Sequence, residues 1–426
     1  MAAVARWGSP VFSQAFSSSP FGASRRTVWH RWKTDGARRR GRLIRPAALC
    51  FASLLAGLKR APRASMRQLA ACQSAAGDAG FTVKAIDGKG LGALATAPIR
   101  RGDRVLQEAP LICMDTNQTS ALDDQTAWQA LDELLRKQVA SLRSDEEARF
   151  WALGDAFTEG EKTAAGVFCT NAVSCEGQAM LFPQTSRMNH SCRPNVVHSW
   201  QGEDGLMVLH ATRAIQPGEE LCICYVPGFL SQEQRQAQLM RRWRFSCCCP
   251  ACKSESTRRS DELRLRLAAL DAQLSAQTRL WQSRSFTASE AEAKESALLS
   301  QVSDMTELIL AEFGPHPAIL CQLFYDAFVL LLLLGRARSS GRMIRLALEE
   351  STAAAGPTAQ TRRFKRFASD PRTHPAFSMS RILADEPSVE AGRPKKASGK
   401  QIAPLRTWLN FVLRLVLVWN PRGSSD

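Results

Sequence analysis

Four cysteines lie within six residues at Cys247–Cys252, in the segment FSCCCPAC that begins at Phe245. The knuckle Cys249-Pro-Ala-Cys252 turns two sulfurs inward, and a third thiolate beside it can occupy another corner of a tetrahedral zinc site. A structural zinc site has four ligands, so a distant segment must fold back to supply the last one. A reduced, metal-free group of thiols is the alternative. Spacing alone leaves open whether Cys248 replaces a neighbour as a ligand.

The other cysteines and the charges near the cluster support a metal. The chain has 13 cysteines, an odd number, and shows no convincing secretory signal. In a reducing compartment, clustered cysteines indicate a metal more often than a set of disulfides. The flanking cations are Arg241, Arg242, Arg244 and Lys253. Because four thiolates on Zn²⁺ leave two negative charges, we expect these cations to balance them.

Charge is distributed unevenly along the 426 residues, whose net charge is +16. Residues 1–77 contribute +13 and residues 356–426 contribute +8, which leaves −5 for residues 78–355. The Arg- and Ser-rich first segment is typical of an organelle transit peptide or of a disordered basic arm, and a mis-assigned start is a further alternative. The mildly acidic body is not expected to bind nucleic acid directly, although it could weakly attract a basic peptide.

Short apolar runs separated by glycine turns predict β-strands between Phe81 and Met114. A helical pattern follows at 124–155, and strands return at 196–200 and 205–210, where QGED predicts a hairpin. Strand-like segments therefore dominate the first half of the chain.

Two segments repeat one turn design, IRRGD at 99–103 and IQPGE at 215–219. In the second, Pro217 and Gly218 suit the two central positions of a type II turn. Each segment precedes a strand-like stretch.

The second half of the chain is predicted to be helical. A capping box at Ser231–Gln234 opens a helix that continues to about Trp243. Further helices are predicted from the cap Ser260, from Thr287 to Gly314-Pro315, over 317–334 and over 341–355.

Two apolar stretches in this half could be read as membrane segments. The run CQLFYDAFVLLLLLG is interrupted by Gln322 and Asp326, so it predicts a buried helix rather than a membrane span. Residues 357–426 are basic and mostly loop-like, but LRTWLNFVLRLVLVW near the end could form an amphipathic helix for a membrane surface or a partner.

Two further motifs combine polar and reactive groups. Residues 187–195 read RMNHSCRPN, and Gly218-Glu-Glu-Leu-Cys-Ile-Cys-Tyr225 ends in one of only two tyrosines in the chain. A buried run of such polar groups needs every group satisfied, which usually indicates a site. Taken alone, Tyr225 could equally be an ordinary core aromatic residue with a polar tip.

In combination, these motifs resemble the SET-domain protein lysine methyltransferases, most closely the SET–MYND group. Four motifs occur in the family's order: Lys89-Gly-Leu-Gly92, Asn189-His-Ser-Cys-Arg-Pro-Asn195, Gly218-Glu-Glu-Leu with Tyr225, and Phe-x-Cys-x-Cys-x-x-Cys at 245–252. The resemblance covers about residues 80–253. We expect the MYND zinc finger to be absent, because Cys113 is the only cysteine between residues 73 and 168.

The resemblance implies an α+β fold: a SET-domain β-fold with a helical insertion, a post-SET zinc site and an all-α helical C-terminal region. The implied parts are a basic disordered or targeting segment at 1–77, the SET domain at 78–228 with its insertion at about 118–165, a post-SET zinc segment at 229–254, a helical domain at 255–356 and a basic tail at 357–426.

The resemblance also implies a reaction, the transfer of a methyl group from S-adenosyl-L-methionine to the ε-amine of lysine in histone or non-histone proteins. Tyr225 would be the catalytic residue of a chain that acts as a monomer. The residues implied to bind the methyl donor are Lys89, Gly90, Leu91, Asn189, His190, Tyr225 and Phe245. The implied ligands of Zn²⁺ are Cys192, Cys247, Cys249 and Cys252.

Two alternatives to this enzyme stay open. One is a catalytically silent SET protein that acts as a scaffold for partners, and the other uses the basic ends to bind nucleic acid or a membrane surface. For the compartment, the resemblance favours nucleus or cytoplasm, whereas the N-terminal composition favours a plastid or mitochondrion.

Overall fold

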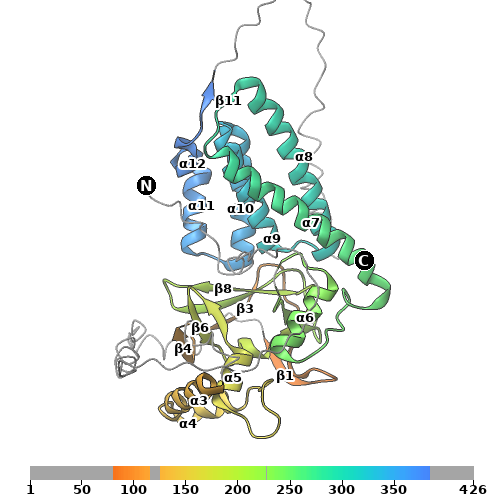
Figure 1. The fold of residues 1–426 in the computed structure, drawn as a ribbon, viewed down its shortest axis with the longest axis vertical. Helices are drawn as coiled ribbons and strands as arrows, with labels where there is room; N and C mark the ends of the chain where they lie inside the picture. Colours follow the sequence, from red (N-terminus) through yellow and green to blue (C-terminus); the bar gives the residue numbers. More distant parts are fainter. Residues whose placement is uncertain (1–79, 116–124, 227, 384–426) are drawn as a thin grey trace, which may run out of the picture. The chain divides into compact units, whose positions relative to one another are not determined.

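The structure, a computed structural model, describes residues 80–115, 125–226 and 228–383. Contacts divide the chain into Met1–Ala76 and Gly77–Asp426, and every described residue belongs to the second unit. The fold is α+β, with most strands before residue 226 and most helices after it (Figure 1). The predictions for residues 1–77 and for LRTWLNFVLRLVLVW lie outside the described residues.

Three β-sheets form the first half of this unit. The first has the order β1 (Phe81–Ile86), β2 (Gly90–Ala95), β10 (Glu220–Ile223) and β7 (Asn189–His190); the second β3 (Arg104–Glu108), β9 (Leu206–Ala211) and β8 (Val196–Gln201); the third β4 (Ile112–Asp115), β6 (Gln178–Leu181) and β5 (Val173–Cys175). The strands predicted between Phe81 and Met114 are confirmed as β1–β4, and the QGED hairpin is confirmed as the β8–β9 pair. Strand β7 runs parallel to β10, with Asn189 beside Cys222. This pairing places two sequence motifs next to each other.

The two repeated turns lie side by side. Ile99 and Ile215 exchange backbone hydrogen bonds of 3.0 and 2.9 Å, so the two segments pair antiparallel. The glycine in each turn, Gly102 or Gly218, has φ of +83°, the left-handed conformation that glycine adopts without strain. The prediction of one turn design used twice is confirmed.

The helical stretch predicted at 124–155 is two helices rather than one, α3 (Gln125–Ala140) and α4 (Ser144–Trp151). Arg143 is the N-cap of α4, with an extended backbone that ends the preceding helical run. The Glu146 side chain accepts a hydrogen bond from the Arg143 backbone and so fixes the start of the second helix. A third helix, α5 (Ala164–Asn171), was not predicted. Its segment AAGVFCTN is almost entirely apolar and buried, so it lacks the alternation of polar and apolar faces that indicates a helix.

Helices α6–α12 follow strand β10. Their bounds are α6 (Gln232–Trp243), α7 (Ser254–Trp281), α8 (Ala288–Phe313), α9 (Pro317–Leu333), α10 (Ala337–Ala355), α11 (Ala359–Ser369) and α12 (Pro375–Ser378). Two short strands, β11 (Phe286–Thr287) and β12 (Ile382–Leu383), pair in parallel. The capping box predicted at Ser231 and the helix start predicted at Thr287, which also has a capping box, are confirmed.

Three helix predictions are wrong in detail. Ser260 is not a cap: α7 begins earlier, after Lys253, and Ser260 lies buried inside it. Helix α10 begins at Ala337 instead of residue 341. Helix α11 was not predicted and lies in the stretch expected to be mostly loop-like. It is held in place because Phe364 and Phe367 pack inward, and only its outer face is basic.

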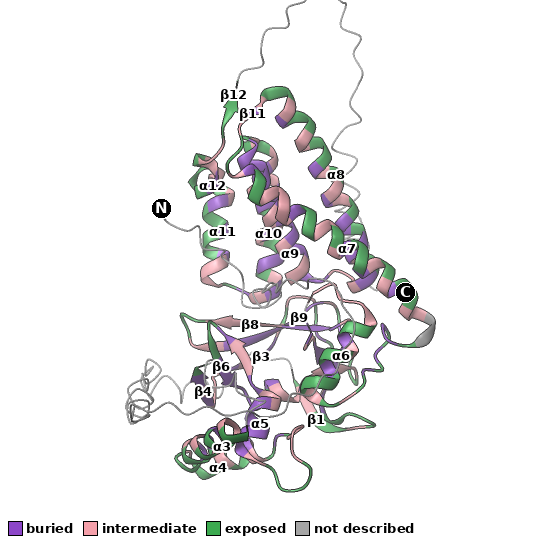
Figure 2. Cartoon of the chain, in the orientation of Figure 1, coloured by how far each residue is buried: buried purple, intermediate pink, exposed green. Residues whose placement is uncertain are grey.

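Helix α9 is the buried helix that its sequence predicts. Most of its residues are buried, and they join the largest hydrophobic cluster of the described residues (Figure 2). None of the helices in the described part of the chain combines the length and the apolar character of a membrane span. A separate cluster of buried residues lies among strands β1–β10.

Candidate functional site

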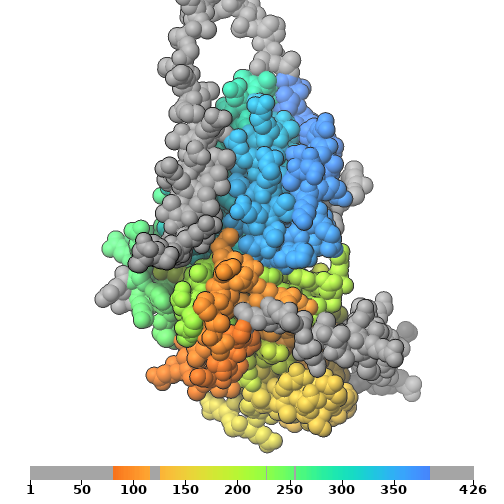
Figure 3. Space-filling model, turned by 180° about the vertical axis from the view of Figure 1, so that it is seen from behind, coloured from red at the N-terminus to blue at the C-terminus, as the bar shows by residue number. Residues whose placement is uncertain are grey.

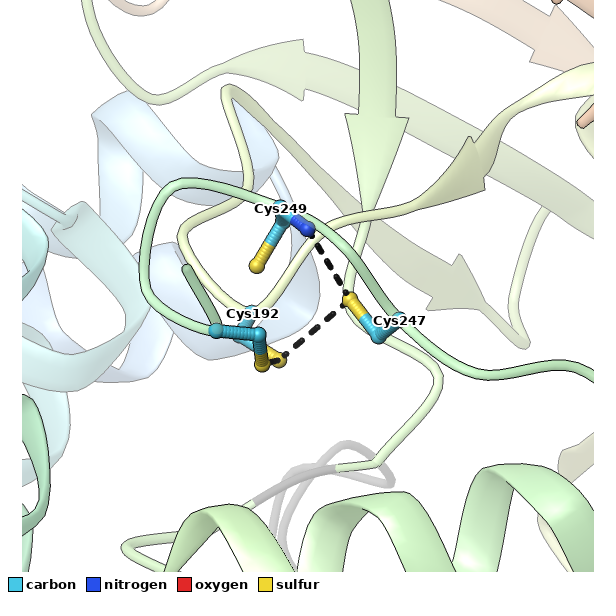
Figure 4. A group of neighbouring side chains, drawn as sticks. Cys192, Cys247 and Cys249 are labelled. Carbon is cyan, nitrogen blue, oxygen red and sulfur yellow. Dashed lines mark hydrogen bonds between the residues drawn. The ribbon is translucent and has the colours of Figure 1, made fainter. Parts of the chain in front are cut away.

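Four cysteine sulfurs meet in one buried group, which we call the sulfur group: Cys192, Cys247, Cys249 and Cys252. Their Sγ atoms all lie within 4.8 Å of one another. Cys192 Sγ is 3.6 Å from Cys252 Sγ and 4.0 Å from Cys247 Sγ. Figure 4 shows the labelled side chains converging from two separate segments. Cys248 is exposed and lies outside the group.

The geometry of the sulfur group is compatible with a metal. Zinc–sulfur bonds of about 2.3 Å place the corners of a tetrahedron about 3.8 Å apart, close to the 3.6 and 4.0 Å separations given above. All four thiols are free rather than joined in disulfides. The backbone nitrogen of Cys249 lies 3.5 Å from Cys247 Sγ and donates a hydrogen bond to it. Four such ligands would leave no open position on a tetrahedral ion.

A buried arginine contacts the sulfur group. Arg235 in α6 is completely buried, and its Nη2 lies 3.7 Å from Cys252 Sγ. Its Nη1 donates to the Leu230 carbonyl oxygen over 2.6 Å. Its Nη1 also lies 3.5 Å from Asp261 Oδ1. A buried charge needs such partners, and negative charge on the sulfurs would be a second one. Sequence reasoning missed Arg235, although it lies four residues before the buried Leu239 on one helix face.

The cations that flank the cysteines in sequence do not occupy this position. Arg241, Arg244 and Lys253 are exposed. Arg242 donates to the Ala172 carbonyl oxygen over 3.2 Å, and its guanidinium lies 4.8 Å from the centre of the Trp243 ring. The cation in contact with the sulfurs is therefore Arg235, and a balance of the thiolates by these four residues stays a prediction.

The turn between β1 and β2 lies beside Asn189. Gly90 has φ of +74° and open space where a Cβ would be. Figure 3 shows residues 80–115, in orange, on one surface of the molecule. Asn189 Nδ2 donates to the Leu91 carbonyl oxygen over 3.3 Å and to Glu220 Oε1 over 2.9 Å. Lys89 Nζ lies 2.5 Å from Glu220 Oε2. Partial burial acts to lower the pKa of Lys89, but the Glu220 carboxylate raises it overall.

Gly92 allows this close approach. A Cβ at this position would lie 2.5 Å from Ile86 Cδ1 and 2.6 Å from Asn189 Nδ2. No side chain fits there without displacing Asn189. Gly92 ends the motif recognised in the sequence, but neither it nor Glu220 was assigned a role.

His190 links Tyr225 to the sulfur group. Burial lowers the pKa of His190 to about 4, so the imidazole is neutral near pH 7. Its Nδ1 accepts a 3.0 Å hydrogen bond from the Tyr225 backbone nitrogen. A neutral ring then carries its proton on Nε2, which lies 3.3 Å from Cys192 Sγ.

The Tyr225 hydroxyl is held in one orientation. It donates a 2.8 Å hydrogen bond to the Met188 carbonyl oxygen, next to Asn189 in the chain. Burial raises the pKa of Tyr225 above its usual value near 10, so the phenol stays protonated. The hydroxyl can therefore donate or accept hydrogen bonds, but it does not act as a base near pH 7.

Two further aromatic rings surround Tyr225. The centre of the Trp243 ring lies 4.9 Å from that of Tyr225, and the Phe245 ring meets Tyr225 edge-on at 6.5 Å. Phe245 also lies 6.1 Å from His190. Arg244, with φ of 57°, reverses the chain between the two aromatic residues. Trp243 was assigned no role from the sequence. The available signal was its position two residues before Phe245, which was assigned to the site.

The strand-rich half of the described residues is similar to known proteins. A sequence model of the SET domain matches residues 90–226. The chain is 30% identical over 176 residues to the histone-lysine N-methyltransferase set5 of Schizosaccharomyces pombe, covering 41% of this chain and 51% of that protein. It is 28% identical over 196 residues to the N-lysine methyltransferase SMYD2-A of Xenopus laevis, covering 43% of each. It is 31% identical over 118 residues to the human protein-lysine N-trimethyltransferase SMYD5, covering 27% of each. The chain thus spans about half or less of the length of these relatives.

Proposed function

The chain carries a SET domain at residues 90–226, and from that premise we propose that it transfers a methyl group from S-adenosyl-L-methionine to the ε-amine of lysine in a protein substrate. The observation that carries the proposal is the position of Tyr225. Its hydroxyl bonds to the carbonyl oxygen of Met188 and its backbone bonds to His190. The phenol thus lies directly beside the Asn189–His190 strand, on which the proposed donor site depends.

The methyl donor would supply a transferable methyl group on a positively charged sulfonium. The residues proposed to hold it are Lys89, Gly90, Leu91, Asn189, His190, Tyr225 and Phe245. The open space at Gly90 supports this assignment, because a ligand can approach the backbone there. Lys89 and Glu220 offer one positive and one negative group, which match the carboxylate and amine of the methionyl end. The half-buried ring of Phe245 is suited to stacking on adenine.

The chain must also favour a neutral lysine as nucleophile. An unperturbed lysine has a pKa of about 10.4, so only about one in 2,500 is neutral at pH 7. Burial beside Tyr225 and Trp243 would disfavour the charged form and raise that fraction. Their rings would align the amine with the methyl group and so contribute proximity rather than acid–base catalysis.

Tyr225 would orient the amine. Its hydrogen is already donated to the Met188 carbonyl oxygen, so the oxygen lone pairs remain to accept from the amine or to face the polarised methyl group. Because the phenol is neutral, it does not compete for the proton of the incoming lysine.

We propose a structural zinc ion at Cys192, Cys247, Cys249 and Cys252. The close, buried sulfurs and the guanidinium of Arg235 support it. The ion would hold the segment carrying Trp243 and Phe245 against the end of β7. It therefore would complete the donor site without taking part in the reaction.

We also propose the division of the chain that the resemblance implies: a SET domain at 78–228, a post-SET zinc segment at 229–254 and a helical C-terminal domain at 255–356. The separate hydrophobic clusters of the helices and of the strands support it. Because α11 and α12 follow residue 356, we propose that the basic tail begins after α12 and not at residue 357.

A methylation assay with the full chain tests the function. Purified protein is incubated with donor labelled in its methyl group and offered core histones and a peptide array, and mass spectrometry then locates the modified lysines. We expect label on the ε-amine of specific lysines. Donor binding by calorimetry without any transfer would instead indicate the silent scaffold, and absence of donor binding would overturn the proposal.

A further inference from the structure

Helices α7 and α8 reach the sulfur group through a cluster of buried polar side chains. We propose that Arg264 and Glu312 are positioning residues that hold the Asn189–Cys192 segment in its active geometry. Both residues lie outside the part of the chain that matches the SET domain. The inference rests on the proposed function, because that segment would hold both the donor and the metal.

Glu312 is the centre of the cluster. It lies in the last turn of α8, and its side chain is 0% exposed. Its Oε1 accepts hydrogen bonds from Ser260 Oγ over 2.6 Å and from Arg264 Nε over 2.7 Å. Its Oε2 accepts from Arg193 Nη2 over 2.7 Å. One carboxylate therefore joins two helices to the residue that follows Cys192.

Arg264 continues the connection to the backbone of Cys192. Its Nη2 donates to the Cys192 carbonyl oxygen over 2.6 Å, while its Nε binds Glu312. Its guanidinium lies 4.5 Å from the centre of the Phe313 ring, and its side chain is 1% exposed. The planar guanidinium thus spans two acceptors in fixed directions, which the single ammonium of lysine cannot do.

The segment needs such support because its own strand is short. Strand β7 has only two residues, and one further backbone bond, from Ser191 N to the Ile223 carbonyl oxygen, extends its pairing with β10. Beyond it, Ser191 Oγ and the backbone of Arg193 make only local contacts of 3.1 and 3.2 Å. Farther along, Pro194 and Asn195 are again held by strand contacts, through hydrogen bonds from Thr212 and with Glu220 and Cys222. Between these two held ends, Arg264 binds the Cys192 carbonyl oxygen and Glu312 binds the Arg193 side chain.

Arg264→Lys tests the inference, with Arg266→Lys as its matched control, because Arg266 is exposed on the same helix. Three quantities are measured below the unfolding temperature of each variant: amide hydrogen exchange in residues 189–195, zinc release to excess chelator, and donor affinity. We expect faster amide exchange, zinc release that is about tenfold faster or more, and a dissociation constant for the methyl donor that is about tenfold higher or more. The reason is that removing a residue that supports metal ligands typically lowers metal affinity or activity about 10–100-fold. The control should match the wild type.

Glu312→Gln, paired with the exposed Glu307→Gln on the same helix, covers the case in which Arg264→Lys fails to fold. If these variants unfold at lower temperature but, while folded, keep wild-type exchange, zinc release and donor affinity, the two residues have a merely structural role and the inference is overturned. Failure of the proposed function is a different result, namely a wild-type chain that transfers no methyl group. Hydrogen exchange still reports on positioning in that case.

Discussion

At the scale of single residues, Tyr225 offers the sharpest substitution. Tyr225→Phe removes the hydroxyl that donates to the Met188 carbonyl oxygen but keeps the ring packed between His190 and Trp243. We expect methyl transfer to fall about 100-fold or more, the size of effect seen when one group that stabilises the transition state is removed from other active sites. Donor affinity should be unchanged. Transfer of labelled methyl groups under single-turnover conditions measures the effect.

The only other tyrosine of the chain is the matched control. The Tyr325 hydroxyl lies in hydrogen-bond contact, 3.1 Å, with His374 Nε2 among the helices, far along the chain from the proposed site. Tyr325→Phe also loses one partly buried hydrogen bond, at a cost of about 1 kcal/mol. Its methyl transfer should stay at the wild-type rate. Full activity in Tyr225→Phe would contradict the assigned role.

Gly92 provides a second test at this scale. In Gly92→Ala the new Cβ would meet Asn189 Nδ2 at 2.6 Å, so the amide must move away from the β1–β2 turn. We expect a loss of about 1–3 kcal/mol in the free energy of unfolding, together with weaker donor binding by calorimetry. Gly154→Ala is the control, because its Cβ would meet nothing within 4 Å. Equal donor affinity in both variants would show that Gly92 serves packing alone.

At the scale of elements, the segment after α6 depends on adjacent cysteines with different surroundings. Cys249 is buried in the sulfur group, whereas Cys248 is exposed. We expect the wild-type protein to carry one zinc ion, Cys249→Ser to lose it and Cys248→Ser to retain it. Elemental analysis of protein purified without chelators measures this. Zinc missing from the wild type, or retained equally in both variants, would contradict the proposed ligand set.

The helices show which elements a sequence pattern can predict. Helices α6 and α8 carry capping boxes, and both were found at the expected residues. Helix α5 was missed because burial on all sides removes the polar face on which helix periodicity depends. Helix α11 was missed because its basic face resembles the tail that follows, while Phe364 and Phe367 pack against aromatic residues of α9.

At the scale of the whole molecule, Glu350 forms one of the contacts between the helices and the strand-rich half. Arg101, in the first of the repeated turns, binds the Glu350 carboxylate of α10 and donates to the Pro315 carbonyl oxygen over 3.0 Å. Burial raises the pKa of Glu350 to about 7, although Arg101 acts in the opposite direction. The folded chain therefore binds this proton more tightly than the unfolded chain.

This pKa predicts a pH-dependent stability. Since the folded pKa lies above the usual 4.5, the contribution of Glu350 to the free energy of unfolding is largest below pH 4.5 and declines as the pH rises to about 7. The decline amounts to up to about 3 kcal/mol. Urea unfolding between pH 5 and 8 should show a smaller decline in Glu350→Gln than in the wild type. Glu307→Gln, at an exposed position of α8, should keep the wild-type slope; a wild-type slope in Glu350→Gln would contradict the raised pKa.

The sequence by itself determined what depends on near neighbours. Repeated turns, capping boxes, strand alternation and the cysteine knuckle each involve residues a few positions apart, so their hydrogen bonds and dihedral angles are readable locally. The order of four motifs was enough to indicate the SET domain. The same local evidence predicted that the cysteine knuckle needs a ligand from a distant segment.

Only the tertiary structure decided which distant groups meet these motifs. Arg264 contacts Cys192 across 72 residues, Arg193 contacts Glu312 across 119, and Lys89 contacts Glu220 across 131. No periodicity specifies such partners, because they depend on how the sheets and helices pack. Flanking arginines were therefore expected at the sulfurs, whereas the buried face of α6 brings Arg235 there instead. Which charged residue can be buried at a site depends on the partners that tertiary packing brings to it, and not on its neighbours in the sequence.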